Sequence, residues 1–330
     1  MLNLPKMRAL LDARQPGHAL PQGCYNDPDV FAFDLEAIHA RHWILVGFDV
    51  ELPAPGSTLS VPIGRSSVLI VRDRQGTLRG FHNTCRHRGA QLCPTGHGQR
   101  SWIICPYHQW TYDLDGRLAN APRMPETFDR AQHGLRPIHV ETVAGSVYVC
   151  LADDPPAFQT FREQLTPLLA PHNLANAKLA FEGTLVERAN WKLVMENARE
   201  CYHCAVRHPE LALTFPVKGR RSVQFADASG VDAFRARMAA FDLPIGPVEG
   251  VDYTIDGLTE LWTKTNLQDL DLCENNQAGV NSRGYVPGPY CDETEQLVMR
   301  FVDWYCDEAT RYIDRHVRVG PRLAAVAGGS

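Results

Sequence analysis

The sequence lacks any long apolar run. No segment of its 330 residues approaches the ~18 consecutive apolar residues that a membrane-spanning helix requires. Residues 1–18 are interrupted by charges and prolines and lack the apolar core of a secretory signal peptide. We therefore expect no membrane segment and a cytoplasmic location.

A strong net charge is also missing. The formal charge is −5 and the isoelectric point is about 6.2, so no field would attract nucleic acid or an anionic membrane, and we expect neither as a partner. There is no internal repeat, no glycine-rich dinucleotide fingerprint and no second set of ferredoxin cysteines. The chain therefore has no motif of its own for taking up electrons from NAD(P)H.

The ten cysteines show no spacing typical of a disulfide framework. A reducing compartment is the simpler expectation. Four ligand-type side chains instead form two pairs: Cys85 and His87 are spaced Cys-x-His, seventeen residues follow, and Cys105 and His108 are spaced Cys-x-x-His. Two thiolates and two imidazoles can hold tetrahedral zinc, or a [2Fe–2S] cluster in which two histidines replace two cysteines on one iron. Cys93 and His97 lie between the pairs, and we interpret them as packing or surface residues.

The order of the chain predicts a helical lead-in, a β-rich domain and a second domain. Residues 1–42 have helical apolar spacing, and we expect them to pack on the second domain. From residue 43, short β-rich runs separated by turns predict a small antiparallel domain. The paired prolines near residue 155 mark a linker, so the boundaries are 1–42, 43–155 and 156–330. In the last part, 158–169 is predicted as helix, 179–189 as strand and 190–211 as a long helix.

That long helix carries a second group of polar residues, Glu196, Asn197, Glu200, His203 and His208. Spacings of four and three place Glu196, Glu200 and His203 on one helical face. His208 would point about 140° away from His203 on a regular helix. If both histidines bind one metal, the helix must loosen or end between them; if they do not, the segment is a surface helix with scattered polar residues.

Both loops resemble known sequences. CRHRGA (85–90) and CPYHQWTYDLDG (105–116) resemble the oxygenase components of Rieske non-haem iron oxygenases, whose [2Fe–2S] cluster would then be held by Cys85, His87, Cys105 and His108. The resemblance implies an α+β protein: an all-β Rieske domain followed by a catalytic domain with an antiparallel sheet flanked by helices (helix-grip type). In that domain His203, His208 and a distant aspartate would hold a mononuclear Fe(II) that reacts with O2, beside Glu200 and Asn197 as catalytic residues. The aspartate is expected to be Asp269, with Asp271 as the competitor.

One interval departs from that family. Sixty residues separate His208 from Asp269, which is shorter than in the enzymes it resembles, so the part from 215 to 248 is expected to be abbreviated. The catalytic sheet is trimmed, a segment is absent from the sequence, or the active site is incomplete. These three explanations stay open at this point.

The closest resemblance is to enzymes acting on quaternary ammonium compounds, carried by NWKLVMENARECYHC (190–204), GVNSRGYVPGPY (279–290) and FVDWYC (301–306). It implies N-demethylation of glycine betaine to dimethylglycine and formaldehyde, with electrons from a separate ferredoxin or flavin reductase that uses NAD(P)H, and a homotrimer in which Glu200 bridges the two metal centres of neighbouring chains. Trp262 and Tyr253 are candidates for aromatic contact with the cation. Two alternatives remain: an aromatic-ring dihydroxylating dioxygenase subunit, and a Rieske protein with an inactive catalytic domain.

Overall fold

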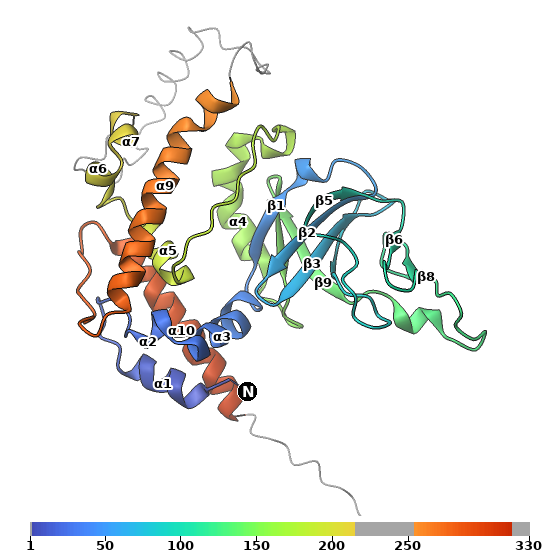
Figure 1. Ribbon diagram of the computed structural model, residues 1–330, viewed down its shortest axis with the longest axis horizontal. Coiled ribbons are helices and arrows are strands. Elements are labelled where there is room, and N and C mark those ends of the chain that lie inside the picture. The colour runs from blue at the N-terminus through green and yellow to red at the C-terminus, as the bar shows by residue number, and fades with distance from the viewer. Residues whose placement is uncertain (1, 215–253, 319–330) are drawn as a thin grey trace, which may run out of the picture. The chain divides into compact units, whose positions relative to one another are not determined.

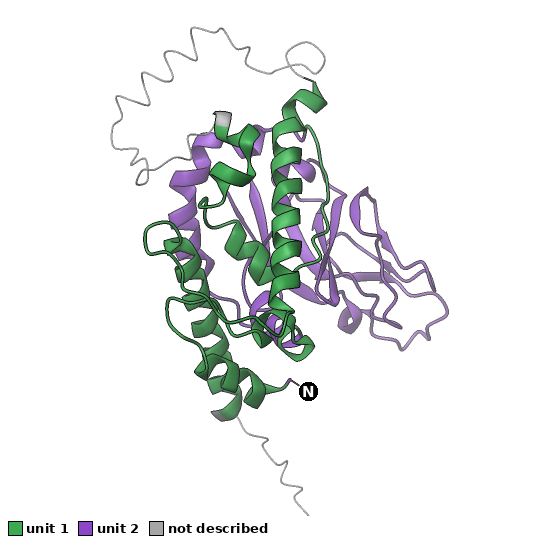
Figure 2. Cartoon of the chain, turned by 60° about the vertical axis from the view of Figure 1, so that its left-hand side comes forward, with its two compact units in different colours: residues 1, 3–31, 180–330 green, residues 2, 32–179 purple. Residues whose placement is uncertain are grey.

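The computed structural model describes residues 2–214 and 254–318, which belong to two compact units (Figures 1 and 2). Unit 1 comprises residues 3–31 and 180–330, and unit 2 comprises residues 32–179. The units therefore divide the chain near residues 31 and 179, where the sequence places boundaries near residues 42 and 155.

Unit 2 is built on a seven-stranded antiparallel sheet. Its order is β1-β10-β9-β4-β3-β2-β5. The strands are β1 (Ile44–Phe48), β2 (Ser57–Ile63), β3 (Ser66–Arg72), β4 (Leu78–His82), β5 (Gly96–Gln99), β9 (Pro137–Val143) and β10 (Ser146–Cys150). The hairpin between β9 and β10 turns at Ala144 and Gly145, which both have positive φ (47° and 89°). The predicted antiparallel β-rich domain is confirmed.

Strand β3 serves two cores because its side chains alternate between the two faces of the sheet. Val68 and Ile70 pack with Leu52, Leu59, Ile138 and Val149. Leu69 and Val71 pack on the opposite side, in a core that includes the cluster-loop residues Cys85 and Cys105. Both pairs of ligand-type residues are therefore fixed to the domain, each through its cysteine.

A second, three-stranded sheet carries the later cluster loop. It consists of β6 (Ile103–Ile104), β7 (Thr111–Tyr112) and β8 (Leu118–Asn120), in that order. The loop from Cys105 to Trp110 connects β6 to β7, and Ile103 pairs with Tyr112 across its base. This pairing holds the two ends of the loop together.

Helix α4 (Phe158–Leu169) belongs to unit 2 although it follows the paired prolines. Phe158 contacts the ring of Trp43 at a centroid distance of 4.8 Å and that of Tyr148, on β10, at 5.6 Å. Buried aromatic rings contribute strongly to packing, so these contacts hold α4 on the β unit even though the paired prolines precede it. The helix therefore joins the β unit, and the division of the chain moves to residue 179.

Unit 1 is helical in the part that the structure describes. Its elements are α1 (Leu4–Asp12), α2 (Gly23–Asn26), α3 (Pro28–Asp34, which reaches into unit 2), α5 (Trp191–Asn197), α6 (Cys204–Arg207), α7 (Pro209–Thr214), α9 (Ile255–Val280) and α10 (Gln296–Arg318). Helix α10 buries one face, with Val298, Phe301, Val302, Tyr305, Ala309, Tyr312 and Ile313 following the i, i+3, i+4 spacing of an amphipathic helix. Trp191 of α5 packs on this face against Phe301 and Tyr305.

The lead-in helix α1 packs on α10, where Arg8 of α1 forms an ion pair with Asp314 and Arg14, just after α1, forms one with Asp303. These contacts hold residues 4–14 against the C-terminal helix of the same unit. Of the predicted lead-in, residues 3–31 belong to unit 1, whereas residues 32–42 belong to unit 2.

The strand predicted over 179–189 is wrong, because these residues form no strand. The chain at the end of this segment bonds to α9: Arg188 N donates to Glu274 Oε1 (3.0 Å), and Asn190 N donates to Gln277 Oε1 (2.7 Å). These two bonds hold the end of the segment against α9. Residues 215–248, where the rest of the catalytic sheet is expected, lie outside the described residues.

Within the described residues, no helix has both the length and the apolar character that crossing a membrane requires.

Candidate metal centres

The two cluster loops of unit 2 have the same backbone hydrogen bonds. Cys85 N donates to Ala90 O (2.8 Å) and Gly89 N to Cys85 O (3.0 Å). The second loop repeats both bonds, from Cys105 N to Trp110 O (2.8 Å) and from Gln109 N to Cys105 O (3.1 Å). The residue four positions after each cysteine has positive φ, 74° at Gly89 and 59° at Gln109. Two equivalent turns thus present one cysteine and one histidine each.

The cysteines lie inside and the histidines outside. Cys85 and Cys105 are buried and close enough for their thiols to interact, and burial raises the pKa of Cys85. His87 is exposed, stacks on Trp110 at a centroid distance of 4.8 Å, and lies 4.6 Å from the ring of His108. The Nδ1 atom of His108 is buried without a hydrogen-bond partner. A buried orphan nitrogen beside two buried thiols is the arrangement that a bound metal cluster satisfies, so these residues fit the group.

The buried side chain of Asn83 holds the end of the first loop through hydrogen bonds. Its Nδ2 donates to Cys93 O (2.7 Å) and Ser60 Oγ (2.9 Å), and its Oδ1 accepts from Cys93 N (2.9 Å). Cys93 is buried in the core, and His97 lies on β5 with Nε2 3.3 Å from Glu51. Cys93 and His97 therefore have packing and surface contacts of their own, apart from the four ligand-type residues.

The histidines of unit 1 come from a chain that leaves the helical path twice. Helix α5 ends at Asn197, and the four-residue α6 then lies between His203 and His208. His208 itself has φ −121° and ψ 69°, outside the helical region. The predicted continuous helix over 190–211 is therefore wrong, and the shared helical face of Glu196, Glu200 and His203 with it. The early break lets the two imidazoles turn toward one point.

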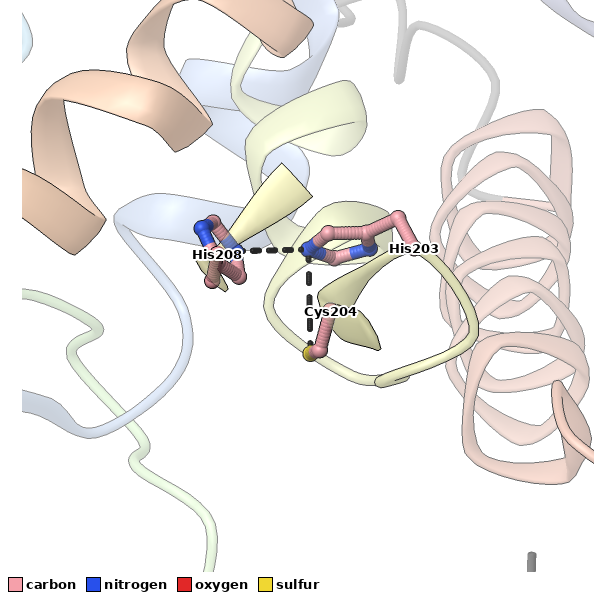
Figure 3. Close-up of side chains that lie close together, drawn as sticks. All are labelled: His203, Cys204 and His208. Carbon is pink, nitrogen blue, oxygen red and sulfur yellow. Dashed lines mark hydrogen bonds between the residues drawn. The ribbon is translucent and has the colours of Figure 1, made fainter. Parts of the chain in front are cut away.

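Three donor atoms meet at that point. His203 Nε2 lies 3.2 Å from His208 Nε2 (Figure 3), and Asp269 Oδ1 lies 3.2 Å from the first and 3.1 Å from the second. Cis ligands about 2.1 Å from an octahedral metal ion lie about 3.0 Å apart. Asp269 Oδ1 is buried and accepts no hydrogen bond of acceptable geometry. The triangle therefore fits one face of a metal ion held by two histidines and one carboxylate.

The other ring nitrogens fix the tautomers. His203 Nδ1 lies 2.5 Å from Glu200 Oε1, and His208 Nδ1 lies 2.8 Å from Gln268 Oε1. Gln268 Nε2 donates to Glu210 Oε2 (3.0 Å), so its oxygen faces His208. Both Nδ1 atoms therefore carry a proton, and both Nε2 atoms point at Asp269, where each can bind a metal once it is deprotonated.

The imidazole of His203 and the carboxylates of Asp269 and Glu200 each stabilise the charged form of the other. Asp269, and then Glu200, raise the pKa of His203 to about 9. Burial acts to raise the pKa of Asp269, but His203, His208 and the hydrogen bond from Asn197 outweigh it, and the pKa is lowered. The same balance, with His203 and the Tyr202 amide as donors, lowers the pKa of Glu200. Both carboxylates are therefore ionised at neutral pH.

The remaining predicted residues are placed as follows. Asp271 is exposed, and only Asp269 of the two lies beside the histidines. Trp262 is 56% exposed on α9, two turns before Asp269 and on the same helical face. Tyr253 lies outside the described residues. No role is predicted for Gln268 from the sequence, although its position next to Asp269 is a signal that could have indicated one.

A disulfide joins Cys201 and Cys204 around His203. The turn between them brings their Cα atoms to 4.9 Å, within the range that a disulfide spans. The expectation that the cysteines form no disulfide is therefore wrong at this pair. Cys204 Sγ lies 4.0 Å from His203 Nε2 (Figure 3), but as a disulfide sulfur it is no thiolate ligand.

A cavity of about 340 Å³ lies beside the histidines in unit 1. Glu196, Asn197, Glu200 and His203 line one side of it, although they are not on one helix. Residues from α2, α9 and the segment before α10 line the rest. Glu196 therefore lines the same cavity as His203, although it is not one of the proposed metal ligands.

Comparison with known families identifies the class that this fold and these sites define. Residues 42–142 match the Rieske [2Fe-2S] domain, and residues 174–246 and 248–310 match the catalytic domain of the ring hydroxylating alpha subunit. The chain belongs to the Rieske non-haem iron oxygenases, as an oxygenase (alpha) subunit. Its cofactors are those of the two domains, a [2Fe–2S] Rieske cluster and a mononuclear iron that reacts with O2, so the zinc alternative is set aside.

Individual proteins of this family to which the chain is similar include oxygenase subunits that act on quaternary ammonium compounds. The chain is 36% identical over 409 aligned positions to the glycine betaine monooxygenase oxygenase subunit of Chromohalobacter salexigens, covering 97% of this chain and 91% of that protein. It is 36% identical to the carnitine monooxygenase oxygenase subunit of Escherichia coli K12, covering 82% and 86%. A solved quaternary ammonium Rieske monooxygenase superposes with a TM-score of 0.72 at 26% identity, covering 91% of this chain and 98% of that one. These matches confirm the predicted α+β fold class.

The alignment also bears on the shortened interval. Its 409 positions exceed the 330 residues of this chain, so the relative has segments that this chain lacks. The catalytic-domain match is interrupted at residue 247, inside the interval between His208 and Asp269. The abbreviation expected there agrees with both observations.

Proposed function

We propose that this chain is the terminal oxygenase subunit that N-demethylates a quaternary ammonium compound, with glycine betaine as the first candidate. The observation that carries the proposal is the identity of 36% with a glycine betaine monooxygenase oxygenase subunit over 97% of this chain. The products would be dimethylglycine and formaldehyde, because hydroxylation of an N-methyl group gives a hemiaminal that loses formaldehyde.

Each unit contributes its own set of proposed metal ligands. Cys85, His87, Cys105 and His108 would hold the cluster; His203, His208 and Asp269 would hold the iron. When bound, the cluster supplies single electrons and the iron supplies reductive activation of O2. Glu200 and Gln268 hold the two imidazoles in the binding tautomer, and Asn197 holds Asp269 through a hydrogen bond.

Electrons are proposed to come from a separate NAD(P)H-dependent ferredoxin or flavin reductase, because the sequence has no dinucleotide fingerprint. They would enter at the exposed edge of His87. A head-to-tail homotrimer is the proposed assembly, since heterologous contacts close into rings. Glu200, already bonded to His203 Nδ1, would bridge to His108 of the neighbouring chain.

The substrate cation cannot donate a hydrogen bond, so aromatic faces and carboxylates are its natural contacts, worth about 0.5–2 kcal/mol each. Trp262 is the described candidate, because it is exposed on the helical face that carries Asp269. Tyr253 is the second candidate and lies outside the described residues.

The experiment supplies reductase, NADH and O2 and measures formaldehyde and dimethylglycine made from glycine betaine. Stoichiometric formation of both supports the proposal. If betaine and carnitine give neither, whereas an arene gives a cis-diol, the chain is an aromatic-ring dioxygenase subunit instead.

The shortened interval favours one other candidate, a Rieske electron carrier with an inactive catalytic domain. Iron analysis separates the two: an oxygenase holds about three iron atoms per chain and a carrier about two, since the cluster accounts for two. The convergence of His203, His208 and Asp269 favours the oxygenase.

A further inference from the structure

Glu196 is a carboxylate held from two sides by tyrosine hydroxyls. Tyr25 Oη donates to Glu196 Oε1 (2.8 Å), and Tyr290 Oη donates to Glu196 Oε2 (2.9 Å). The three residues come from α2, α5 and the segment before α10, so tertiary packing brings this carboxylate and its two tyrosines together. One hydroxyl donor on each carboxylate oxygen fixes the position of the Glu196 side chain.

Glu196 and its two tyrosines line a cavity, large enough for water, that His203 of the proposed iron site also lines. Glu196, Glu200 and His203 all line the cavity of about 340 Å³, together with Tyr25 and Tyr290. At about 30 Å³ per molecule, such a volume holds on the order of ten waters. Glu196 therefore lies on the same cavity as His203 and the carboxylate that orients it.

The charges around Glu196 place its titration near neutrality. Burial raises its pKa to about 7, against the opposing effects of the Tyr25 and Tyr290 hydrogen bonds and the charge of Lys192 on its own helix. Glu295, from the segment before α10, acts in the same direction as burial. From α9, Cys273 lines the cavity and stays protonated, because burial raises its pKa to about 12. Acids that exchange protons during catalysis are most effective near the operating pH.

We propose that Glu196, positioned by Tyr25 and Tyr290, is the proton donor that serves the cavity beside His203 during O2 reduction. This rests on the proposed oxygenase function. Hydroxylation of one C–H bond consumes one O2, two electrons and two protons, and it releases one water. The electrons come from the reductase. The O–H bond of the Glu196 carboxyl breaks, its proton passes to cavity water, and the carboxylate is protonated again from solvent. Glu196 acts through water, so it is a positioning and relay residue.

The first test follows the carboxyl group itself in the intact, metal-loaded protein. Infrared difference spectra between wild type and Glu196→Gln isolate the C=O stretch of the protonated Glu196 side chain. Its amplitude is expected to titrate with a midpoint near 7. Tyr290→Phe removes a donor that favours the carboxylate, so the midpoint moves upward. Tyr285→Phe is the matched control: Tyr285 lines the same cavity but donates to Leu20 O (3.0 Å), so the midpoint stays in place.

The second test is single turnover of reductase-free, prereduced protein with O2 and glycine betaine. Glu196→Gln should slow formaldehyde formation about 10-fold to 100-fold, the range in which one general acid contributes. Glu196→Asp should restore part of the rate. In Tyr290→Phe the alkaline limb of the rate profile should move in the same direction as the infrared midpoint, a change that a purely structural role of Tyr290 would not produce.

Two results overturn the proposal: no band that titrates near neutrality and vanishes in Glu196→Gln, or an unchanged rate and pH profile in that variant while wild type releases formaldehyde. The second result leaves the proposed function standing. A wild type that makes no formaldehyde refutes the betaine assignment, and the infrared titration, which needs no substrate, still decides whether Glu196 exchanges protons.

Discussion

The Nε2 atoms of His203 and His208 lie 3.2 Å apart, although a regular helix would point their side chains about 140° away from each other. The chain achieves this by ending α5 at Asn197 and placing α6 between the two residues. Asp269, from α9, completes the triangle. The local breaks and the distant carboxylate together define the proposed iron site.

Asp269→Ala should remove the mononuclear iron and all oxygenation and leave the cluster spectrum unchanged. The carboxylate is the only anionic member of the triangle, and its Oδ1 is buried without a hydrogen-bond partner. Iron analysis and the visible spectrum measure both effects. Asp271→Ala is the control: Asp271 is exposed two residues away, and its loss should change neither. The opposite pattern would show that Asp271 is the ligand.

Gln268→Ala should weaken Fe(II) binding about 10-fold to 100-fold, the usual effect of losing a residue that orients a ligand. The variant leaves His208 Nδ1 without the acceptor that now lies 2.8 Å away. Anaerobic titration of the metal-free protein measures the dissociation constant. Gln277→Ala, on the same helix but bonded to Asn190 instead, should bind Fe(II) as the wild type does.

Metal binding should release a proton and strengthen with pH. The pKa of His203 is raised to about 9 in the metal-free chain, and an imidazole must be neutral to bind a metal. Below this value the metal displaces a proton, so the apparent affinity should rise about tenfold per pH unit between about pH 7 and 9. By the same linkage, the stabilising effect of protonated His203 on the metal-free chain is complete below 6.5 and is lost as pH rises through about 9.

The variant Glu200→Gln should lower the pKa of His203, because Glu200 is one of the two groups that raise it. The affinity should then stop rising at a lower pH. Glu274→Gln, whose carboxylate bonds Arg188 N on the far part of α9, should leave the pH dependence unchanged. If the affinity stopped rising at the same pH in wild type and Glu200→Gln, this account would be contradicted.

Tyr112→Phe should lower the reduction potential of the cluster. Tyr112 Oη accepts from Arg86 N (3.0 Å), so its own proton is free to donate to Cys85 Sγ at 3.3 Å. A bond to a ligand sulfur favours the more electron-rich reduced cluster. Its loss should shift the potential by tens of millivolts, since ~1 kcal/mol is about 40 mV for one electron. Redox titration by EPR measures it, with Tyr107→Phe, which lies against His108 and away from the sulfurs, as the control.

Glu200→Gln should keep both metal centres and slow electron transfer between them, if Glu200 bridges His203 and the His108 of a neighbouring chain. The carboxylate is ionised and already bonded to His203 Nδ1 at 2.5 Å. Single-turnover oxidation of the reduced cluster measures the step, and size-exclusion chromatography with light scattering measures the trimer. A normal rate in the variant would refute the bridge.

The sequence by itself determined the parts that close over a few residues. The Cys-x-His and Cys-x-x-His loops close through bonds such as Cys85 N to Ala90 O, and the hairpin at Ala144 and Gly145 follows from a local turn. Such features depend on neighbours in the chain, so spacing predicts them. Helix α4, predicted over 158–169, follows from its own periodicity in the same way.

Tertiary structure decided the rest. Residues 179–189 do not form the predicted strand, and the chain at their end bonds to side chains of α9 through the amides of Arg188 and Asn190. Asp269 is preferred to Asp271 because α9 turns only the first toward the histidines. Glu196 meets Tyr25 and Tyr290, which are 171 and 94 residues away in the chain. These contacts depend on which helices pack together, and that is settled by burial of distant side chains rather than by any local pattern of residues.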